Sequence, residues 1–372
     1  MEPRNPHTAI NPFTPGFGQV PAYLAGREYL LNEIKTALAS PSFSPDLTTL
    51  FIGARGTGKT ALLSYLSEYA SGVGWVTVGV SATSGMLEDI IEETKYRANH
   101  LLETTSGPKI KEVTAGGFGI AWENVLQQEG NWRTRMNQIL DQLEKYQAGL
   151  LITVDEVNPA VDEMIRLVSV YQHFVREGRR VALMLAGLPS MVSGLVSNEY
   201  VSFLRRARHR KLDRIPDHEI ADAFRRTIEQ SERTVGDVAV EKATQAIDGF
   251  PYMLQLVGFQ SWRRNPANTM VSMSDVEEGI RMANAEMRTK VLQATYGELS
   301  KGDIRFVNAM LDSSDRPTLA EVASHMGVKS NYASKYKTRL MEAGVIGETP
   351  LNTLRFELPR FEDYAREMKE AL

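Results

Sequence analysis

The sequence contains no cysteine among its 372 residues. This absence excludes disulfide bonds, thiolate metal sites and a cysteine nucleophile. The histidines do not suggest a metal site either, because they are scattered along the chain without the spacing of metal ligands. We interpret them as ordinary side chains. They are His7, His100, His173, His209, His218 and His325.

Long apolar runs are also absent. No segment reaches the unbroken run of about 18 apolar residues that a membrane span needs, and residues 1–5 do not open onto the apolar core of a signal peptide. We therefore expect a soluble, cytoplasmic protein without a membrane partner. The formal net charge of -4 and the isoelectric point near 6.0 exclude a uniformly basic protein, but they leave room for one local basic surface.

The composition is that of a globular protein. Hydrophobic residues make up 42% of the chain and charged residues 24%, so sizeable cores can be buried. The length is enough for two or three domains. Residues 1–22 hold five prolines. Because proline fixes φ and lacks a backbone donor, we predict an extended arm there.

Apolar strands and helices alternate after the arm. An amphipathic helix is predicted over Arg27–Leu38, and further helices over Thr60–Tyr69 and Asp162–Glu177. Continuous apolar runs fit strands that are buried on both faces of a parallel sheet. The predicted strands are Thr48–Ile52, Trp75–Val80, Leu150–Val154, Val181–Leu185 and, more weakly, His209–Ile215. The layout is therefore α/β. Between the second and third strands, Gly107–Gly130 is interpreted as a hairpin or surface insertion without an assigned role.

Strand patterns end at Pro216. The helical stretches that follow predict an all-helical subdomain, with helices at 217–233, 238–247, 252–264 and 275–296. The last of them begins with Ser274 and Glu277, which have the spacing of a capping box.

The C-terminal segment predicts a winged helix-turn-helix. Ser300 with Asp303 caps a first helix, and Thr318 with Glu321 opens a second. Ser330 caps a third, and strands at 345–348 and 354–358 form the wing. The chain is thus expected to have four parts: an arm (1–25), an α/β domain (26–215), a helical lid (216–298) and a winged helix domain (299–372).

The loop Gly53–Thr60 matches the pattern G-x-x-x-x-G-K-[ST], between an apolar strand and a helix. Its glycines let the backbone curl so that N–H groups point at phosphate oxygens, and the helix adds its N-terminal dipole. Lys59 then reaches the β- and γ-phosphates, and the Thr60 hydroxyl coordinates Mg²⁺. The nucleotide is expected to contact Gly53, Ala54, Arg55, Gly56, Thr57, Gly58, Lys59, Thr60 and Ala61.

An acidic pair, Asp155 and Glu156, follows another apolar strand. A phosphate loop requires such a partner, because the metal is held from the end of a second buried strand. We predict that Asp155 binds Mg²⁺ through its water shell. Glu156 is placed to orient and deprotonate an attacking water, and with Lys59 it is a candidate catalytic residue. The expected activity is ATP hydrolysis, because no guanine-reading Asn-Lys-x-Asp motif occurs.

The phosphate loop, the acidic pair and the helical subdomain resemble the AAA+ and STAND branch of P-loop ATPases. The order of elements over residues 20–372, with a winged helix at the end, is similar to that of archaeal origin-recognition ATPases. The segment Pro21–Glu28 resembles the one that packs on the adenine in these proteins. The resemblance makes Tyr23 and Leu24 candidates for the base pocket, although they would equally anchor the arm. Gly249-Phe250-Pro251 resembles the Gly-x-Pro of STAND lids, which places Pro251 near the nucleotide, although Gly and Pro also break helices without a ligand.

Two features depart from the AAA+ pattern. Residues 186–189 offer no polar side chain where a γ-phosphate sensor is usual, and the lid arginine is missing, since Arg263 and Arg264 come too late. Hydrolysis is therefore expected to be slow or partner-stimulated. Arg205, just before the fifth strand, matches the position of an arginine finger that acts on a neighbouring subunit. A solvated basic helix end is the alternative interpretation.

The last helix of the winged motif is rich in cations and carries no acidic residue before Glu342. Such a helix suits the major groove of double-stranded DNA. The candidate DNA contacts are Lys329, Asn331, Tyr332, Lys335, Lys337 and Arg339. Winged helices also dock on proteins, so the sequence supports a DNA-binding ATPase switch and, alternatively, a STAND-type signalling ATPase with a protein partner or self-association. A third hypothesis is a nucleotide-binding regulator without turnover.

Overall fold

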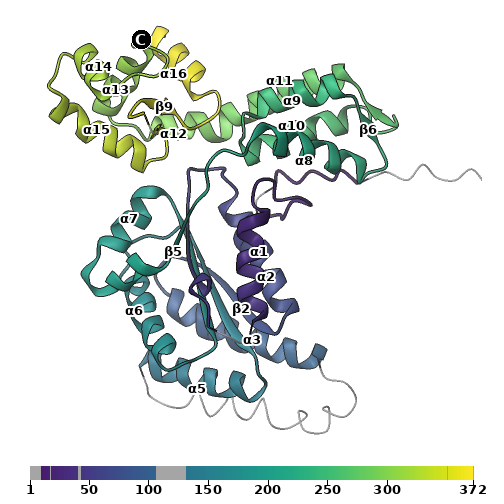
Figure 1. Ribbon diagram of the computed structural model, residues 1–372, viewed down its shortest axis with the longest axis vertical. Coiled ribbons are helices and arrows are strands. Elements are labelled where there is room, and N and C mark those ends of the chain that lie inside the picture. The colour runs from purple at the N-terminus through teal and green to yellow at the C-terminus, as the bar shows by residue number, and fades with distance from the viewer. Residues whose placement is uncertain (1–9, 17, 41–42, 106–130, 350, 372) are drawn as a thin grey trace, which may run out of the picture.

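A computed structural model describes residues 10–16, 18–40, 43–105, 131–349 and 351–371. The fold has three parts, and Figure 1 shows the lid and the winged helix side by side above the α/β domain. The predicted insertion Gly107–Gly130 lies outside the described residues.

The core of the α/β domain is a five-stranded sheet in the order β2-β3-β4-β1-β5, and every neighbouring pair is parallel. The predicted strands are confirmed, because the buried strands coincide with the apolar runs. β5 ends four residues before the predicted limit and is an exposed, charged edge strand, which protects the sheet against further pairing. The strands are β1 Thr48–Ile52, β2 Trp75–Ser81, β3 Gly149–Asp155, β4 Val181–Gly187 and β5 Arg208–Lys211.

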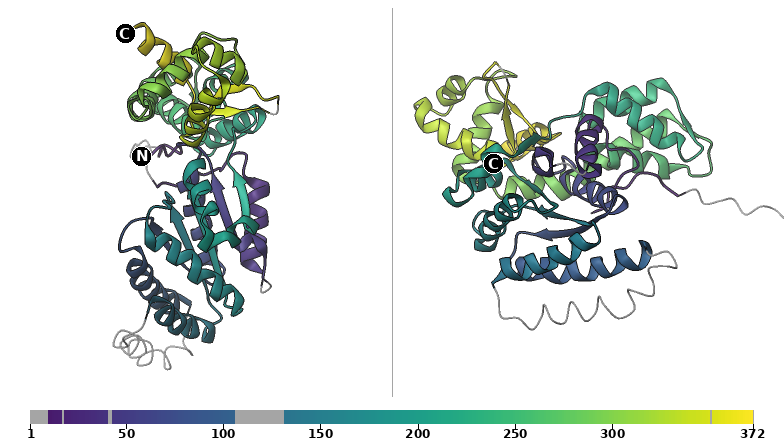
Figure 2. Two further views of the ribbon diagram at one scale, coloured as in Figure 1. Left: turned by 90° about the vertical axis from the view of Figure 1, so that its left-hand side faces the viewer. Right: turned by 60° about the horizontal axis from the view of Figure 1, so that its bottom comes forward.

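Helices cover both faces of this sheet (Figure 2), and each face has its own hydrophobic cluster. Alternation along β3 divides its side chains, so that Leu150 and Ile152 join one cluster and Leu151 joins the other. On one face lie α1 Glu28–Ala39 and α2 Lys59–Gly72, and the short 3₁₀ turn Pro45–Leu47 comes between them in the chain. On the other lie α3 Met86–Thr105, α5 Trp132–Lys145, α6 Asp162–Arg176, α7 Pro189–Ser197 and the 3₁₀ segment η2 Glu199–Arg206.

The lid packs its helices around a third cluster, which continues without a break into the winged helix. Its helices are α8 Asp217–Glu229, α9 Asp237–Ile247, α10 Pro251–Arg264, α11 Met273–Met287, the π-helical turn η3 Arg288–Leu292 and α12 Gln293–Gly297. The prediction of an all-helical lid is wrong in one detail. The segments β6 Thr234–Val235 and β7 Met270–Val271 form a short parallel pair. Strands of two residues are too short to give a recognisable pattern in the sequence.

The start of α11 differs from the prediction. Ser272, not Ser274, is the N-cap, and it exchanges hydrogen bonds with Asp275, not Glu277. Both pairs have the spacing of a capping box, but Asp275 is buried and also accepts a hydrogen bond from Asn265. Tertiary burial thus selects one of two equivalent local patterns.

The winged helix has the predicted order and one further helix. Ser300 and Asp303 form the predicted capping box, whereas Ser330 is the first helical residue after the N-cap Lys329. Thr318 accepts a hydrogen bond from the Glu321 N–H, but the Glu321 carboxylate bonds Ser314 instead. The elements are α13 Lys301–Leu311, α14 Leu319–His325, α15 Ser330–Glu342, β8 Ile346–Glu348, β9 Leu354–Phe356 and α16 Phe361–Glu370. Over the described residues, no helix has the length and apolarity needed to cross a membrane.

We expect Asp275→Ala to lower the free energy of unfolding by about 1–2 kcal/mol, because it removes the carboxylate half of the α11 capping box and the acceptor for Asn265. The matched variant Glu277→Ala should change it by less than about 0.5 kcal/mol. Burial alone would raise the pKa of Asp275, but hydrogen bonds from Ser272 and Asn265 and the charge of Arg233 lower it on balance.

A carboxylate with a lowered pKa stabilises the fold above its ordinary value of about 4 and loses that effect as the pH falls below it. The difference between the two variants should therefore shrink in acid. Denaturant unfolding followed by circular dichroism measures it, and equal losses for the two variants would contradict the assignment.

Candidate functional site

The loop between β1 and α2 has a backbone that only glycine accommodates easily. Gly56 and Gly58 have φ of 78° and 86°, in the left-handed region. A Cβ on Gly56 would lie 2.6 Å from Cε1 of the lid residue Phe250. The Thr57 hydroxyl donates to the Ala54 carbonyl at 2.9 Å and closes the turn. The loop is therefore shaped by its own glycines and by the lid above it.

Lys59 folds back into this loop. Its Nζ donates to the Gly53 and Ala54 carbonyls at 2.9 and 2.7 Å. Burial lowers the pKa of Lys59 to about 8, although Asp155 and Glu156 act in the opposite direction. The amine is thus held by neutral carbonyls in a desolvated place, where a phosphate would be a much stronger partner.

Thr60 and Asp155 meet although they are 95 residues apart. The Thr60 hydroxyl donates to Asp155 Oδ2 at 2.5 Å. Asp155 ends β3, and the Glu156 N–H donates to its Oδ1 at 2.9 Å. Glu156 itself has φ of 54°, an uncommon conformation that turns the chain sharply after the strand. A hydroxyl beside a carboxylate suits Mg²⁺, which usually takes one or two protein oxygens together with phosphates and water.

These groups line one cavity of about 510 Å³ between the α/β domain, the arm and the lid. Its wall divides chemically. Lys59 and the acidic pair supply charge and Thr60 a hydroxyl, while Tyr23, Leu24 and Pro251 supply apolar surface. The loop residues 55–61 lie in the wall, whereas Gly53 and Ala54 lie just behind it, with their carbonyls on Lys59.

Gly249 positions the first turn of α10 over the loop. It has φ of 70°, and a Cβ there would lie 2.6 Å from the Ile215 carbonyl oxygen. Its own carbonyl accepts from the Ile215 N–H at 2.8 Å, and the Tyr252 N–H donates to the Gly56 carbonyl at 3.3 Å. The Gly-x-Pro segment is therefore more than a helix break, because it brings Pro251 and Tyr252 to the cavity.

Two cations of the cavity wall were not foreseen from the sequence. Arg27 lines the cavity and donates to the Asp213 carbonyl at 2.8 Å, and burial lowers the pKa of Arg27. Lys290 lies in the π-helical turn η3 and pairs with Glu286 at 2.6 Å, which raises the pKa of Lys290. A π turn has no sequence signature, and such turns often mark functional sites.

The two departures from the AAA+ pattern persist in three dimensions. β4 ends at Gly187 and α7 begins at Pro189, so the strand tip carries no polar side chain before Ser190. Arg263 and Arg264 end α10, about 20 Å from its start at 1.5 Å per residue. Arg205 lies exposed at the end of η2, where its Nε donates to the Val196 carbonyl at 3.4 Å. Among the described residues, Arg205 is not part of the cavity wall.

The predicted DNA-contacting residues separate into two groups. Lys329, Asn331, Tyr332 and Lys335 are exposed on the N-terminal part of α15. Lys337 is instead paired with Glu348 of the wing at 2.6 Å, and Arg339 with Asp303 at 2.9 Å.

Two further residues of α15 pack on the protein. Tyr336 packs over Gly302 and donates a hydrogen bond to the Tyr332 hydroxyl, and Leu340 is buried.

The winged helix contacts the phosphate loop itself. A Cβ on Gly344, directly after α15, would lie 2.9 Å from the Ala54 Cβ. Arg55 pairs with Glu298 at the end of the lid at 2.9 Å, and α15 also packs against α7. The segments that carry the winged helix therefore contact the phosphate loop at Ala54 and Arg55.

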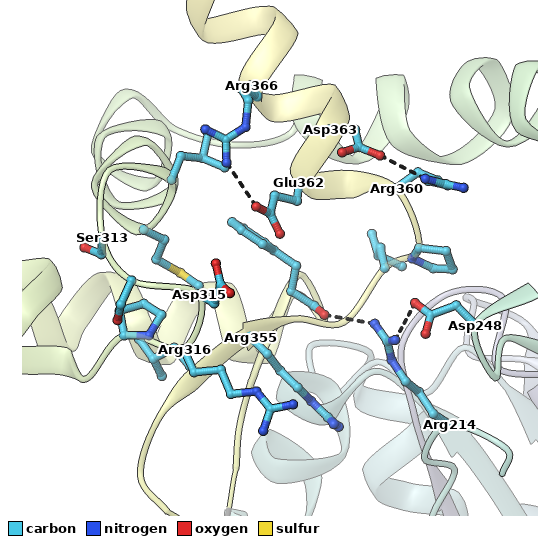
Figure 3. A pocket seen from close by; sticks show the side chains of 18 of the residues that line it. Arg214, Asp248, Ser313, Asp315, Arg316, Arg355, Arg360, Glu362, Asp363 and Arg366 are labelled. Carbon is cyan, nitrogen blue, oxygen red and sulfur yellow. Dashed lines mark hydrogen bonds and ion pairs between the residues drawn. The ribbon is translucent and has the colours of Figure 1, made fainter. Parts of the chain in front are cut away.

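A second contact region between the three parts is an arginine-rich cavity of about 470 Å³ (Figure 3). Arg214, which follows β5, pairs with Asp248 of the lid and donates to the Phe356 carbonyl of the wing at 3.1 Å. One side chain thus ties the α/β domain, the lid and the wing together. Arg360 and Arg366 in the same wall are held by Asp363 and Glu362.

Comparison with known proteins agrees with this architecture. A family model described as a domain of unknown function (DUF8462) matches residues 289–365. No curated protein sequence matches the chain. The structure is similar to the Walker-type ATPase PABY2304 of Pyrococcus abyssi, with a TM-score of 0.65 and 14% identity over 91% of this chain and 95% of that one.

Two further archaeal structures are similar. The ORC2 protein of Aeropyrum pernix in its ADPNP–ADP complexes has a TM-score of 0.63 at 14% identity, covering 96% and 97% of the two chains. Cdc6p of Pyrobaculum aerophilum has a TM-score of 0.51 at 15% identity, covering 96% and 98%. The predicted fold is confirmed: the chain has the fold of archaeal origin-recognition-type P-loop ATPases, with a helical lid and a C-terminal winged helix.

The lowered pKa of Lys59 predicts a pH-dependent site. Above about pH 8 the amine of the free protein loses its proton, and a neutral amine attracts phosphate less. The dissociation constant for MgADP should therefore rise between about pH 7 and 9.5, by up to about tenfold per unit above pH 8. Titration of a fluorescent ADP analogue measures it. Lys59→Arg, whose charge persists over this range, should flatten the profile, and an equally flat profile in the unaltered protein would contradict the prediction.

Proposed function

We propose that this protein is a nucleotide-dependent switch that binds ATP or ADP with Mg²⁺, hydrolyses ATP slowly, and controls a winged helix that binds double-stranded DNA. The observation that carries the proposal is the convergence of Lys59, Thr60 and Asp155 on one cavity beneath the lid. The phosphate-loop motif, its left-handed glycines and the acidic strand end support the same chemistry independently.

Each residue has a distinct part in this proposal. The loop N–H groups and the Lys59 ammonium bind the phosphates. Thr60 and Asp155 hold Mg²⁺, which neutralises phosphate charge when bound. Glu156, next to Asp155 at the end of β3, accepts the proton of the attacking water. Tyr23, Leu24 and Pro251 enclose the base, since they belong to the apolar part of the cavity wall.

The side chains near the cavity support slow turnover. The tip of β4 has no polar side chain before Ser190, and Arg205 lies away from the cavity. If Arg205 acts as an arginine finger, it serves the cavity of a second copy of the chain, so turnover would depend on self-association.

The packing of the winged helix on the phosphate loop supports the switch. Ala54 touches Gly344, and Arg55 pairs with Glu298. A ligand that rearranges the loop therefore acts on the segments that hold the winged helix. DNA contact falls to Lys329, Asn331, Tyr332 and Lys335, because the cations further along α15 are paired within the domain.

The same packing also favours a second candidate, a STAND-type signalling ATPase. In that case the winged helix serves mainly as a clamp on the nucleotide domain, and a protein partner takes the place of DNA. The contact between α15 and α7 supports it, because the helix that would enter a groove already packs against the nucleotide domain.

Two substitutions test the nucleotide site. Lys59→Ala should weaken ATP binding by at least about 10- to 100-fold, because it removes a charged hydrogen-bond donor. Glu156→Gln should leave affinity nearly unchanged and lower hydrolysis by about 10²–10⁴-fold, since the amide cannot accept the proton. Isothermal titration and a phosphate-release assay measure these effects. If Lys59→Ala binds ATP as well as the unaltered protein, the site assignment is wrong.

Salt dependence tests the DNA proposal. Each phosphate contact should contribute about -0.9 to the slope of log K against log salt. Lys335→Ala should make the slope shallower by about 1, whereas Lys242→Ala, an exposed cation on the lid helix α9, should not. Fluorescence anisotropy with a duplex oligonucleotide measures the slopes. Absence of duplex binding would reject this proposal in favour of the signalling alternative.

A further inference from the structure

The arm inserts an aromatic side chain into the lid. Phe13 is only 2% exposed and belongs to the hydrophobic cluster of the lid. Its ring lies 5.8 Å from that of Phe224, and it occupies a notch that exists because α10 carries glycine at position 258. A Cβ on Gly258 would lie 2.1 Å from Phe13 Cε1. The fit depends on the absence of a single methyl group.

Hydrogen bonds on both sides of Phe13 fix the arm in this position. Asn11 Nδ2 donates to the Phe259 carbonyl at 3.0 Å, and Asn11 Oδ1 accepts from the Phe13 N–H at 3.1 Å. The Thr14 N–H donates to Gln255 Oε1 at 2.9 Å. We call residues 11–16 the strap. Figure 1 shows the purple N-terminal segment running along the lid before it joins α1.

The strap continues directly from its anchor into the nucleotide cavity. Thr14, Pro15 and Gly16 are part of the cavity wall, together with Gln255, which holds Thr14. Further along the arm, Tyr23 is part of the same wall, and its hydroxyl accepts from Gln230 of the lid at 2.9 Å. Arg27 then ties the arm to the Asp213 carbonyl. The chain is therefore attached to the lid at Phe13 and again at Tyr23, and to the segment after β5 at Arg27, and residues between these attachments line the cavity.

We propose that Phe13 is a positioning residue for the nucleotide site: it locks the strap on the lid, so that Thr14, Pro15 and Gly16 close the cavity and retain bound nucleotide. The proposal rests on the nucleotide binding proposed above. Phe13 does not line the cavity itself, and it acts through the three residues that follow it. Nucleotide leaves when the ring withdraws from the notch.

The test is the rate at which a fluorescent ADP analogue leaves the full-length protein during a stopped-flow chase with excess ADP. Phe13→Ala should raise this rate at least about tenfold, which corresponds to about 1.4 kcal/mol of lost retention. Gly258→Ala should do the same, because its methyl group displaces the ring. Alanine is also the better helix former, so this variant does not weaken α10 intrinsically.

Three variants separate positioning from general stability. Ile10→Ala alters a neighbouring arm residue that is 89% exposed, and it should leave release unchanged. Val276→Ala weakens the same lid core from α11, and should lower thermal stability without faster release. The double variant Phe13→Ala/Gly258→Ala partly fills the notch, so it should regain stability relative to Phe13→Ala while release stays fast.

Hydrogen exchange gives a second readout, because the amide of Thr14 should lose protection in Phe13→Ala when its bond to Gln255 is lost. Release at the unaltered rate in both Phe13→Ala and Gly258→Ala would overturn the proposal. So would a release rate that only follows thermal stability across all variants. If the unaltered protein binds no ADP, the proposed function fails instead, and Lys59→Ala then gives the same null result.

Discussion

The close approach of the lid to Gly56 is the constraint on which the rest of the site depends. Phe250 fills the space where a side chain at position 56 would lie, and the Tyr252 N–H bonds the Gly56 carbonyl. The loop could curl around a phosphate without a lid, but its position relative to Pro251 and Tyr252 is set by this contact. Gly344 makes a similarly close contact with Ala54, which brings the winged helix to the same loop. Because of these two glycines, the lid and the winged helix both pack closely on the phosphate loop.

Electrostatics make the loop ready for an anion. Lys59 is buried against carbonyl groups, and the burial that lowers its pKa also leaves its charge poorly solvated. Arg27, Arg55 and Lys290 stand at or near the same wall. Carbonyl oxygens or carboxylates already hold each of these cations. Phosphate binding would exchange such partners, and in doing so it would act on the lid and on the helix that leads to the winged domain.

Polar and close-packed contacts join the winged helix to the remainder, beside the packing of α15 on α7. Arg55 reaches Glu298, Gly344 meets Ala54, and Arg214 binds both the lid and the wing. Its hydrophobic core is continuous with that of the lid, so the two are expected to move together against the α/β domain. Residues in the N-terminal turns of α15 are exposed and therefore accessible.

Local patterns determined the secondary structure and the chemistry of the loop. Three features depend only on residues that are close in sequence: the apolar runs, the phosphate-loop spacing and the acidic strand end. They could therefore be recognised from the sequence alone. Where two local patterns were equivalent, only the tertiary structure selected one: Ser272 with Asp275 forms the capping box of α11 in place of Ser274 with Glu277, because Asp275 is buried. The positions of Lys290 in the cavity wall, Lys337 on Glu348 and Phe13 in the notch of Gly258 also needed the fold. These contacts join residues that neither periodicity nor spacing relates, because packing between elements brings them together.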